Sequence, residues 1–217
     1  MLDPLLAMLI VQVISFAILV YSVILHEIAH GFVADKLGDP TARLAGRLTL
    51  DPRPHIDLWM TIVLPLILFL SNAGVIFGAA KPVPIDPYNF RDPKKDTALT
   101  ALAGPLTNIL IAILFALLLR IALSLLPTGE LMTMIQSLFL QAVVLNVSLA
   151  VFNLIPLPPL DGFKVLAGIL SDDIADQMYR LERYGFMIIF AILLLFPNVI
   201  FGIISPIART IIGLLVF

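Results

Sequence analysis

The sequence has no cysteine among its 217 residues, which excludes disulfide bonds, thiolate metal sites and a cysteine nucleophile. Charge is scarce too: Asp, Glu, Lys and Arg make up 13% of the chain, against about 25% in soluble domains. The formal net charge of −2 argues against a nucleic-acid-binding surface. In contrast, 60% of the residues are hydrophobic and the mean hydropathy is +1.07. A soluble fold of this size could not hide so much apolar surface, so we expect an integral membrane protein surrounded by lipid.

Long uncharged runs divide the chain. About 20 residues suffice for a helix to cross a bilayer, and a backbone in lipid must satisfy its own hydrogen bonds, which favours a helix for each run. The polar connections between the runs are too short for a second domain, so we expect one domain over 1–217, with a core at about 4–160 and C-terminal helices at about 180–217. The uncharged runs cover 4–25, 58–80, 97–119, 131–160 and 184–208.

A metal-binding motif ends the first run, where the sequence reads His26-Glu27-Ile28-Ala29-His30. Residues four apart share one face of a helix, so both imidazoles can reach one ion, and Glu27 can act as general base beside a metal-bound water. The alternative is a pair of histidines that only pack in a core. Ionisable residues at the end of a membrane run are costly and usually functional, which favours the metal site.

A catalytic zinc usually has three protein ligands, so the two histidines need a partner. One candidate is Asp161, which follows Pro156, Pro158 and Pro159; these prolines must end the preceding helix and place the carboxylate in an extended segment. The other candidate is His55, which could equally be an interfacial side chain without a ligand role.

Three motifs together resemble those of the site-2 proteases, which are polytopic zinc metalloproteases that cleave transmembrane helices. They are the motif at 26–30, Ala103-Gly104-Pro105-Leu106-Thr107-Asn108, and the segment from Asn153 to Gly162. The resemblance implies one catalytic Zn²⁺ held by His26, His30 and Asp161, with Glu27 as the catalytic glutamate. It also implies that Asn153 binds the substrate backbone or the oxyanion. For Gly104-Pro105 we expect only local packing or bending, and for Asn108 a hydrogen bond between helices.

The resemblance is to the compact prokaryotic branch without a PDZ or CBS domain. It implies an intramembrane metalloendopeptidase in a prokaryotic cell membrane, with a transmembrane protein as substrate, the lipid bilayer as surroundings and no nucleic-acid partner. The oligomeric state stays open. Two alternatives remain: a non-catalytic membrane zinc-binding or metal-transport protein, which would need no general base, and a membrane metalloprotease of interfacial or prenylated peptides.

The run 58–80 contains Pro65 and the helix-breaking cluster Ser71-Asn72-Ala73-Gly74. If the ligands of one ion lie at one depth, this run must be re-entrant or shallow, because a full span would separate Asp161 from the histidines. Segments 36–96 and 161–183 then share one side and hold eleven of the thirteen Lys and Arg residues. The positive-inside rule therefore predicts that the active-site face is cytoplasmic.

The expected fold class is an all-α polytopic membrane protein with a three-helix catalytic core at about 4–35, 97–126 and 131–158. A further helix begins near 180, and the tail 197–217 either crosses the membrane or lies at its surface. The segment 40–52 lacks a helical pattern and is bracketed by Asp-Pro turns. The resemblance implies a short membrane-associated β segment there, and the alternative is an interfacial loop. For 171–183 we expect an amphipathic helix capped by Ser171.

Overall fold

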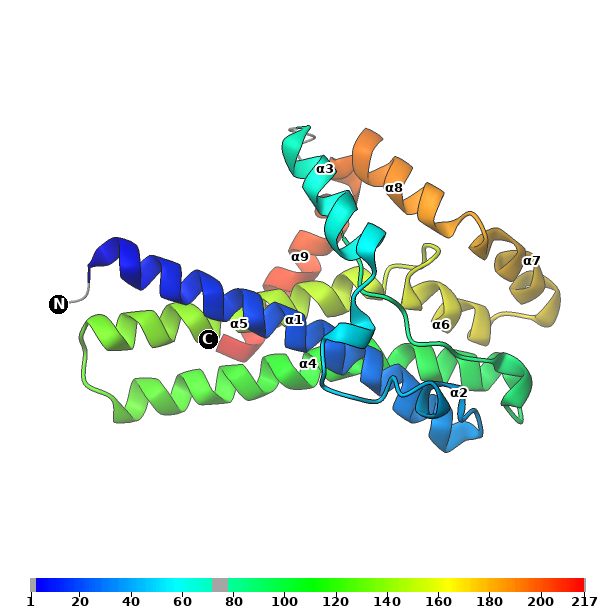
Figure 1. The fold of residues 1–217 in the computed structure, drawn as a ribbon, viewed down its shortest axis with the longest axis horizontal. Helices are drawn as coiled ribbons and strands as arrows, with labels where there is room; N and C mark the ends of the chain where they lie inside the picture. The colour runs from blue at the N-terminus through cyan, green and yellow to red at the C-terminus, as the bar shows by residue number, and fades with distance from the viewer. Residues whose placement is uncertain (1–2, 72–77, 217) are drawn as a thin grey trace.

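Three long helices form the centre of the computed structural model, which describes residues 3–71 and 78–216. They are α1 (Pro4–Leu37), α4 (Pro93–Leu125) and α5 (Glu130–Asn153), which pack against one another (Figure 1). All three are long and apolar enough to cross a membrane, which confirms the predicted core. Helix α5 ends five residues before the predicted boundary at 158, because the proline-rich segment beginning at Pro156 cannot supply helical N–H donors.

The run 184–208 divides into two helices at the point where the sequence placed the start of a separate tail, residue 197. Helix α8 (Gly185–Leu195) is too short to span a bilayer, whereas α9 (Pro197–Val216) is long enough. The break falls at Phe196 (φ −135°, ψ 49°), because a residue before proline is disfavoured in the helical region. Helix α9 packs on α5, where Ala208 is buried with Val143 and Val147.

The two described ends of segment 58–80 lie next to each other, as expected for a re-entrant segment. It begins as a π-helical stretch, η2 (Leu58–Val63), and continues as α3 (Leu64–Leu70). These helices rise about 20 Å in total, less than a bilayer core of about 30 Å. The Ala79 N–H then donates to the Met60 carbonyl at 3.1 Å, and the Thr61 hydroxyl donates to the Ala79 carbonyl at 2.7 Å, so both ends of the segment lie together. The predicted break at Asn72–Gly74 lies outside the described residues.

The predicted β segment at 40–52 is wrong, because no strand occurs in residues 3–71 and 78–216. A short helix, α2 (Thr41–Leu44), begins there instead and is followed by a 3₁₀ turn, η1 (Arg53–His55). The cause is the buried Asp39 carboxylate, which accepts the Thr41 N–H at 3.1 Å and so starts a helical turn. A backbone that bonds within its own turn has no free edge for strand pairing.

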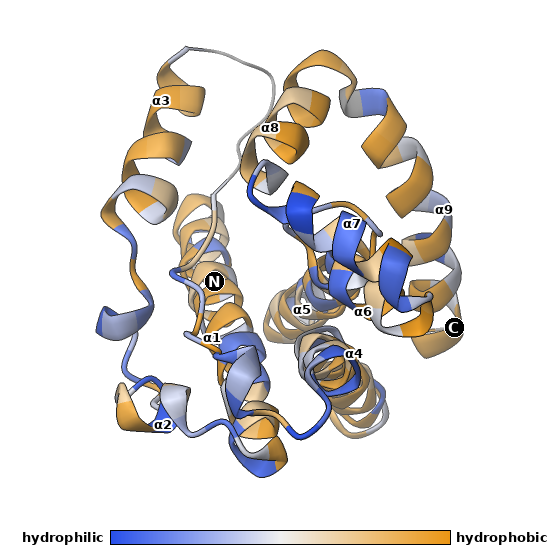
Figure 2. Cartoon of the chain, turned by 90° about the vertical axis from the view of Figure 1, so that its right-hand side faces the viewer, coloured by the Kyte–Doolittle hydropathy of each residue, from blue (hydrophilic) through white to orange (hydrophobic). Residues whose placement is uncertain are grey.

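Two short helices complete the end of the bundle that holds most of the charges. Helix α6 (Asp161–Ile169) packs on α4, and α7 (Asp172–Glu182) follows it with many polar residues (Figure 2). Lys164 of α6 pairs with Glu182 at 3.2 Å. The predicted amphipathic helix is thus confirmed with Ser171 at its N-cap, although the Ser171 side chain makes no capping hydrogen bond. A 3₁₀ turn, η3 (Pro87–Asn89), precedes α4.

Candidate metal centre and active site

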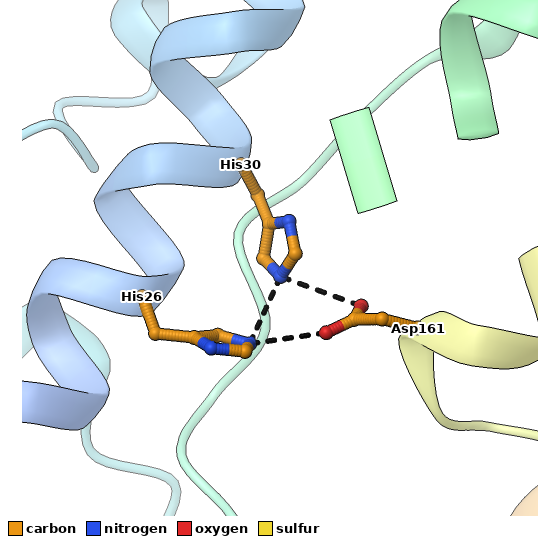
Figure 3. A group of neighbouring side chains, drawn as sticks. All are labelled: His26, His30 and Asp161. Atoms are coloured by element: carbon orange, nitrogen blue, oxygen red, sulfur yellow. Dashed lines mark hydrogen bonds and ion pairs between the residues drawn. The ribbon is translucent and has the colours of Figure 1, made fainter. Parts of the chain in front are cut away.

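Three side chains from two distant parts of the chain converge at one point. His26 and His30 lie on one face of α1 with their Nε2 atoms 3.0 Å apart, and Asp161 is the first residue of α6 (Figure 3). Asp161 Oδ2 lies 3.2 Å from Nε2 of His26, and Oδ1 lies 3.4 Å from Nε2 of His30. Both histidines are buried. In the described part of the chain, His26, His30 and Asp161 form the group of side chains that could hold a metal ion.

The outer nitrogens of both imidazoles are held by oxygen atoms. His30 Nδ1 lies 2.7 Å from the Thr100 carbonyl, which can only accept, so this nitrogen carries the proton. His26 Nδ1 lies 2.6 Å from Asn108 Oδ1, and the Asn108 amide is oriented because its Nδ2 donates to Asn146 Oδ1 at 3.0 Å. In the neutral imidazoles both Nε2 lone pairs therefore point into the site, which is the tautomer that metal ligation requires.

The donor set fits a zinc ion. The Nε2 lone pairs of both imidazoles and the Asp161 carboxylate face one another at hydrogen-bond distance, although all three groups are acceptors. Asp161 Oδ2 is buried and has no hydrogen-bond partner. Tetrahedral zinc with bonds of about 2.0–2.1 Å places its ligand atoms about 3.3–3.4 Å apart, close to the observed 3.0–3.4 Å. Three ligands leave the fourth position open for water.

Helix α4 forms the floor of the site through residues for which the sequence suggested only packing or helix contact. A Cβ at Gly104 would lie 2.6 Å from Nε2 of His26 and 2.5 Å from Nε2 of His30, so only glycine fits. Asn108 and Asn146 are fully buried and form a relay from His26 to the Ala142 carbonyl, which accepts from Asn146 Nδ2 at 3.0 Å. The sequence contained a signal for Asn108 and Asn146, because an amide inside a long uncharged helix needs a polar partner.

Glu27 and Asn153 line the same cavity of about 1060 Å³ as the three converging side chains. Glu27 is half-buried, and its Oε2 accepts the backbone N–H of Val83 at 2.8 Å. Asn153 is the last residue of α5, and its amide donates to the Leu149 carbonyl at 3.0 Å. The structure therefore brings every predicted site residue except His55 to one cavity.

His55 lies elsewhere and is not part of the cluster. It is 3% exposed, and its Nε2 faces the Thr49 carbonyl at 2.9 Å within the loop that it closes. The fold places Asp161, the third ligand implied by the family resemblance, against both histidines, and keeps His55 away from them.

Two buried histidines in a His-Glu-x-x-His motif, next to a distant carboxylate and among helices that can cross a bilayer, are typical of a membrane metalloprotease. Comparison with known proteins agrees: the sequence profile of Peptidase family M50 matches residues 14–127 and 121–196. The chain therefore belongs to this family, the site-2 proteases, and is an integral membrane protein whose cofactor is Zn²⁺.

Relatives support this assignment over most of the chain. The Bacillus subtilis protein named "Putative zinc metalloprotease YwhC" is 36% identical over 181 residues, which cover 82% of this chain and 78% of that protein. "Putative zinc metalloprotease MJ0611" of Methanocaldococcus jannaschii is 33% identical over 70% of this chain and 73% of that protein. "Putative zinc metalloprotease Rip2" of Mycolicibacterium smegmatis is 28% identical over 80% of this chain, but the match spans only 63% of Rip2. No solved structure matches.

Proposed function

We propose that this protein is an intramembrane metalloendopeptidase that hydrolyses peptide bonds in transmembrane protein substrates, with its active site facing the cytoplasm of a prokaryotic cell. One observation carries the proposal: Glu27 lies in the same cavity as the three metal-binding side chains. A protein that only carries or stores metal needs the ligands but has no use for a carboxylate beside the open position.

We assign the site residues as follows. His26, His30 and Asp161 would hold the zinc, which supplies a Lewis acid and lowers the pKa of a bound water to about 7. The Glu27 carboxylate accepts the proton of the attacking water and returns it to the leaving amine. The Asn153 amide, on the wall of the same cavity, would donate to the substrate carbonyl as negative charge develops there.

Cleavage within the bilayer is supported by the depth of the site. From Glu27 to Asp35, the next acidic residue, α1 rises about 12 Å through residues that are apolar except for His30. The cavity is nevertheless lined both by charged side chains, such as Lys164 and Glu182, and by apolar ones, such as Met60 and Leu149, so it offers contacts to water and to an apolar peptide. With segment 58–80 re-entrant, most of the Lys and Arg residues lie on the same side of the membrane as the active-site face, which supports a cytoplasmic orientation of that face.

Glu27→Gln tests the proposal because glutamine keeps the shape and removes the base. The purified, zinc-loaded variant should fail to cleave a model transmembrane substrate in liposomes while retaining one zinc per chain. Glu130→Gln, the same change at an exposed position at the start of α5, should cleave at the wild-type rate. Appreciable cleavage by Glu27→Gln would refute the assigned base, and wild-type protein that binds zinc but cleaves no transmembrane substrate would favour the metal-carrier alternative.

The ligand assignment is tested by metal analysis of Asp161→Ala and His55→Ala. Asp161→Ala should purify with little zinc, whereas His55→Ala should keep it, because His55 faces Thr49 rather than the cluster. The reverse pattern would make His55 the third ligand.

A further inference from the structure

We infer that Arg47 is a positioning residue for Glu27 and acts through the single peptide group that joins Pro82 to Val83. The inference rests on the proposed role of Glu27. It concerns a buried cation that lies outside the metal cluster and to which the sequence motifs give no role.

The two ends of this peptide group bind opposite charges. The Val83 N–H donates to Glu27 Oε2 at 2.8 Å, and the Pro82 carbonyl accepts from Arg47 Nη1 at 3.2 Å. The C=O and N–H of a trans peptide point in opposite directions, so the guanidinium and the carboxylate lie on opposite sides of one planar unit. Hydrogen bonds in such a chain polarise one another, and a charged partner at each end strengthens both.

Arg47 has no other evident reason to be buried as a cation. Arg47 is only 7% exposed, and its Nε is buried without a hydrogen-bond partner. Its second nitrogen, Nη2, donates to the Lys81 carbonyl at 2.7 Å, and none of the ion pairs in the described residues includes Arg47. A guanidinium withdrawn from water and matched only by two backbone carbonyls is costly, and what it holds is the chain directly before Val83.

The segment around Val83 is otherwise anchored away from Glu27. The Lys81 N–H donates to the His55 carbonyl at 2.9 Å, and the Asp86 N–H donates to Asp39 Oδ2 at 2.8 Å. These bonds fix the ends of the segment but not the rotation of the peptide between them. Arg47 supplies that orientation, and Val83 in turn holds one oxygen of Glu27, so that the carboxylate stays fixed beside the metal ligands.

One NMR signal can report both hydrogen bonds. Pro82-Val83 is the only Pro-Val pair in the sequence, so protein labelled with ¹³C-carbonyl proline and ¹⁵N-valine gives a single carbonyl–amide correlation for this peptide. In the zinc-loaded protein, Arg47→Met should move both the carbonyl ¹³C and the amide ¹H resonances, and Glu27→Gln should move the amide ¹H. Arg43→Met removes an exposed arginine that pairs with Asp35 and should leave the signal in place.

Kinetics complete the test. Arg47→Met should lower kcat by about 10-fold to 100-fold, the scale expected for a misplaced catalytic group, with unchanged KM and zinc content. Arg47→Lys, which keeps the charge but replaces the planar guanidinium with a single ammonium, should recover part of the loss. An unmoved Pro82-Val83 signal in Arg47→Met, or a kcat that falls only in step with zinc content, would overturn the inference. Active Glu27→Gln protein would refute the proposed base instead, and the NMR result would still decide whether Arg47 and Glu27 are linked.

Discussion

The backbone of Gly104 lies directly against the His26 imidazole, so that a methyl group at residue 104 would be 2.6 Å from the ligand nitrogen Nε2. Real Cβ atoms do not approach other atoms so closely, and the nearest atoms belong to the two side chains that must converge on the metal. Because residue 104 of α4 has no side chain, His26 and His30 have room to face each other at the candidate metal site.

Gly104→Ala should reduce the affinity for zinc by at least about tenfold, a loss of the size seen when the support of a metal ligand is disturbed. The added methyl group must displace His26 or His30, because both Nε2 atoms lie within its reach. Metal content after dialysis against a graded chelator measures the change. Gly202→Ala on α9, where a Cβ would meet nothing within 4 Å, is the matched control. Equal zinc affinity in both variants would show that the site tolerates a side chain in its floor.

Asn108→Ala should weaken zinc binding by about 10–100-fold, because it removes the acceptor that holds the proton on Nδ1 of His26. Without that partner the imidazole can rotate or change tautomer, and Asn146 loses the donor to its Oδ1 as well. Chelator competition measures the affinity. Asn198→Ala, which removes an exposed amide in α9, should bind zinc normally. A normal affinity in Asn108→Ala would limit this amide to helix packing.

Asp39 should make the fold sensitive to acid. Burial raises the pKa of its carboxyl, but hydrogen bonds from Thr41, Asn89 and the Asp86 N–H outweigh this and hold the pKa below its usual range. The resulting stabilisation is complete above the ordinary Asp pKa of about 3.9 and is lost as the pH falls from there through the folded-state pKa.

Asp39→Asn should therefore lower the free energy of unfolding by about 1–3 kcal/mol at neutral pH, and the difference from wild type should shrink in acid. Thermal unfolding in detergent between pH 3 and 8 measures it. Asp173→Asn, at an exposed position on α7, should follow the wild-type curve. A difference that stays constant over this pH range would exclude the Asp39 carboxylate as its cause.

The absence of native cysteine allows the topology to be tested with single cysteines at exposed positions. Cysteines at Leu44, Tyr88 and Asp173 should react with an impermeant reagent only from the cytoplasmic side, and a cysteine at Gly129 only from outside. Labelling of Leu44 and Tyr88 from opposite sides would show that segment 58–80 crosses the membrane. Labelling of all three from outside would reverse the orientation of the active-site face.

The local features of this protein followed from its sequence for clear physical reasons. Long uncharged runs predict membrane helices because lipid offers no partner for backbone or charge, and the spacing of His26 and His30 defines one helix face wherever that helix lies. Prolines after Asn153 predicted the end of α5 within a few residues. Pro197 was the same kind of signal, and the structure separates α8 from α9 at the residue before it.

Only the tertiary structure decided which distant residues meet. Asp161 and His55 were both chemically able to complete the site, and the packing of α6 on α4 brings Asp161 to the histidines while His55 closes its own loop. The same holds for Gly104, Asn108 and Arg47: their roles depend on atoms of other helices and loops within a few ångströms, and no local periodicity encodes those distances. Sequence alone therefore determined the lipid surroundings, the helices and the metal motif of this protein. The fold decided which candidate third ligand lies against the histidines and which residues surround the site, because these relationships depend on contacts between segments far apart in the chain.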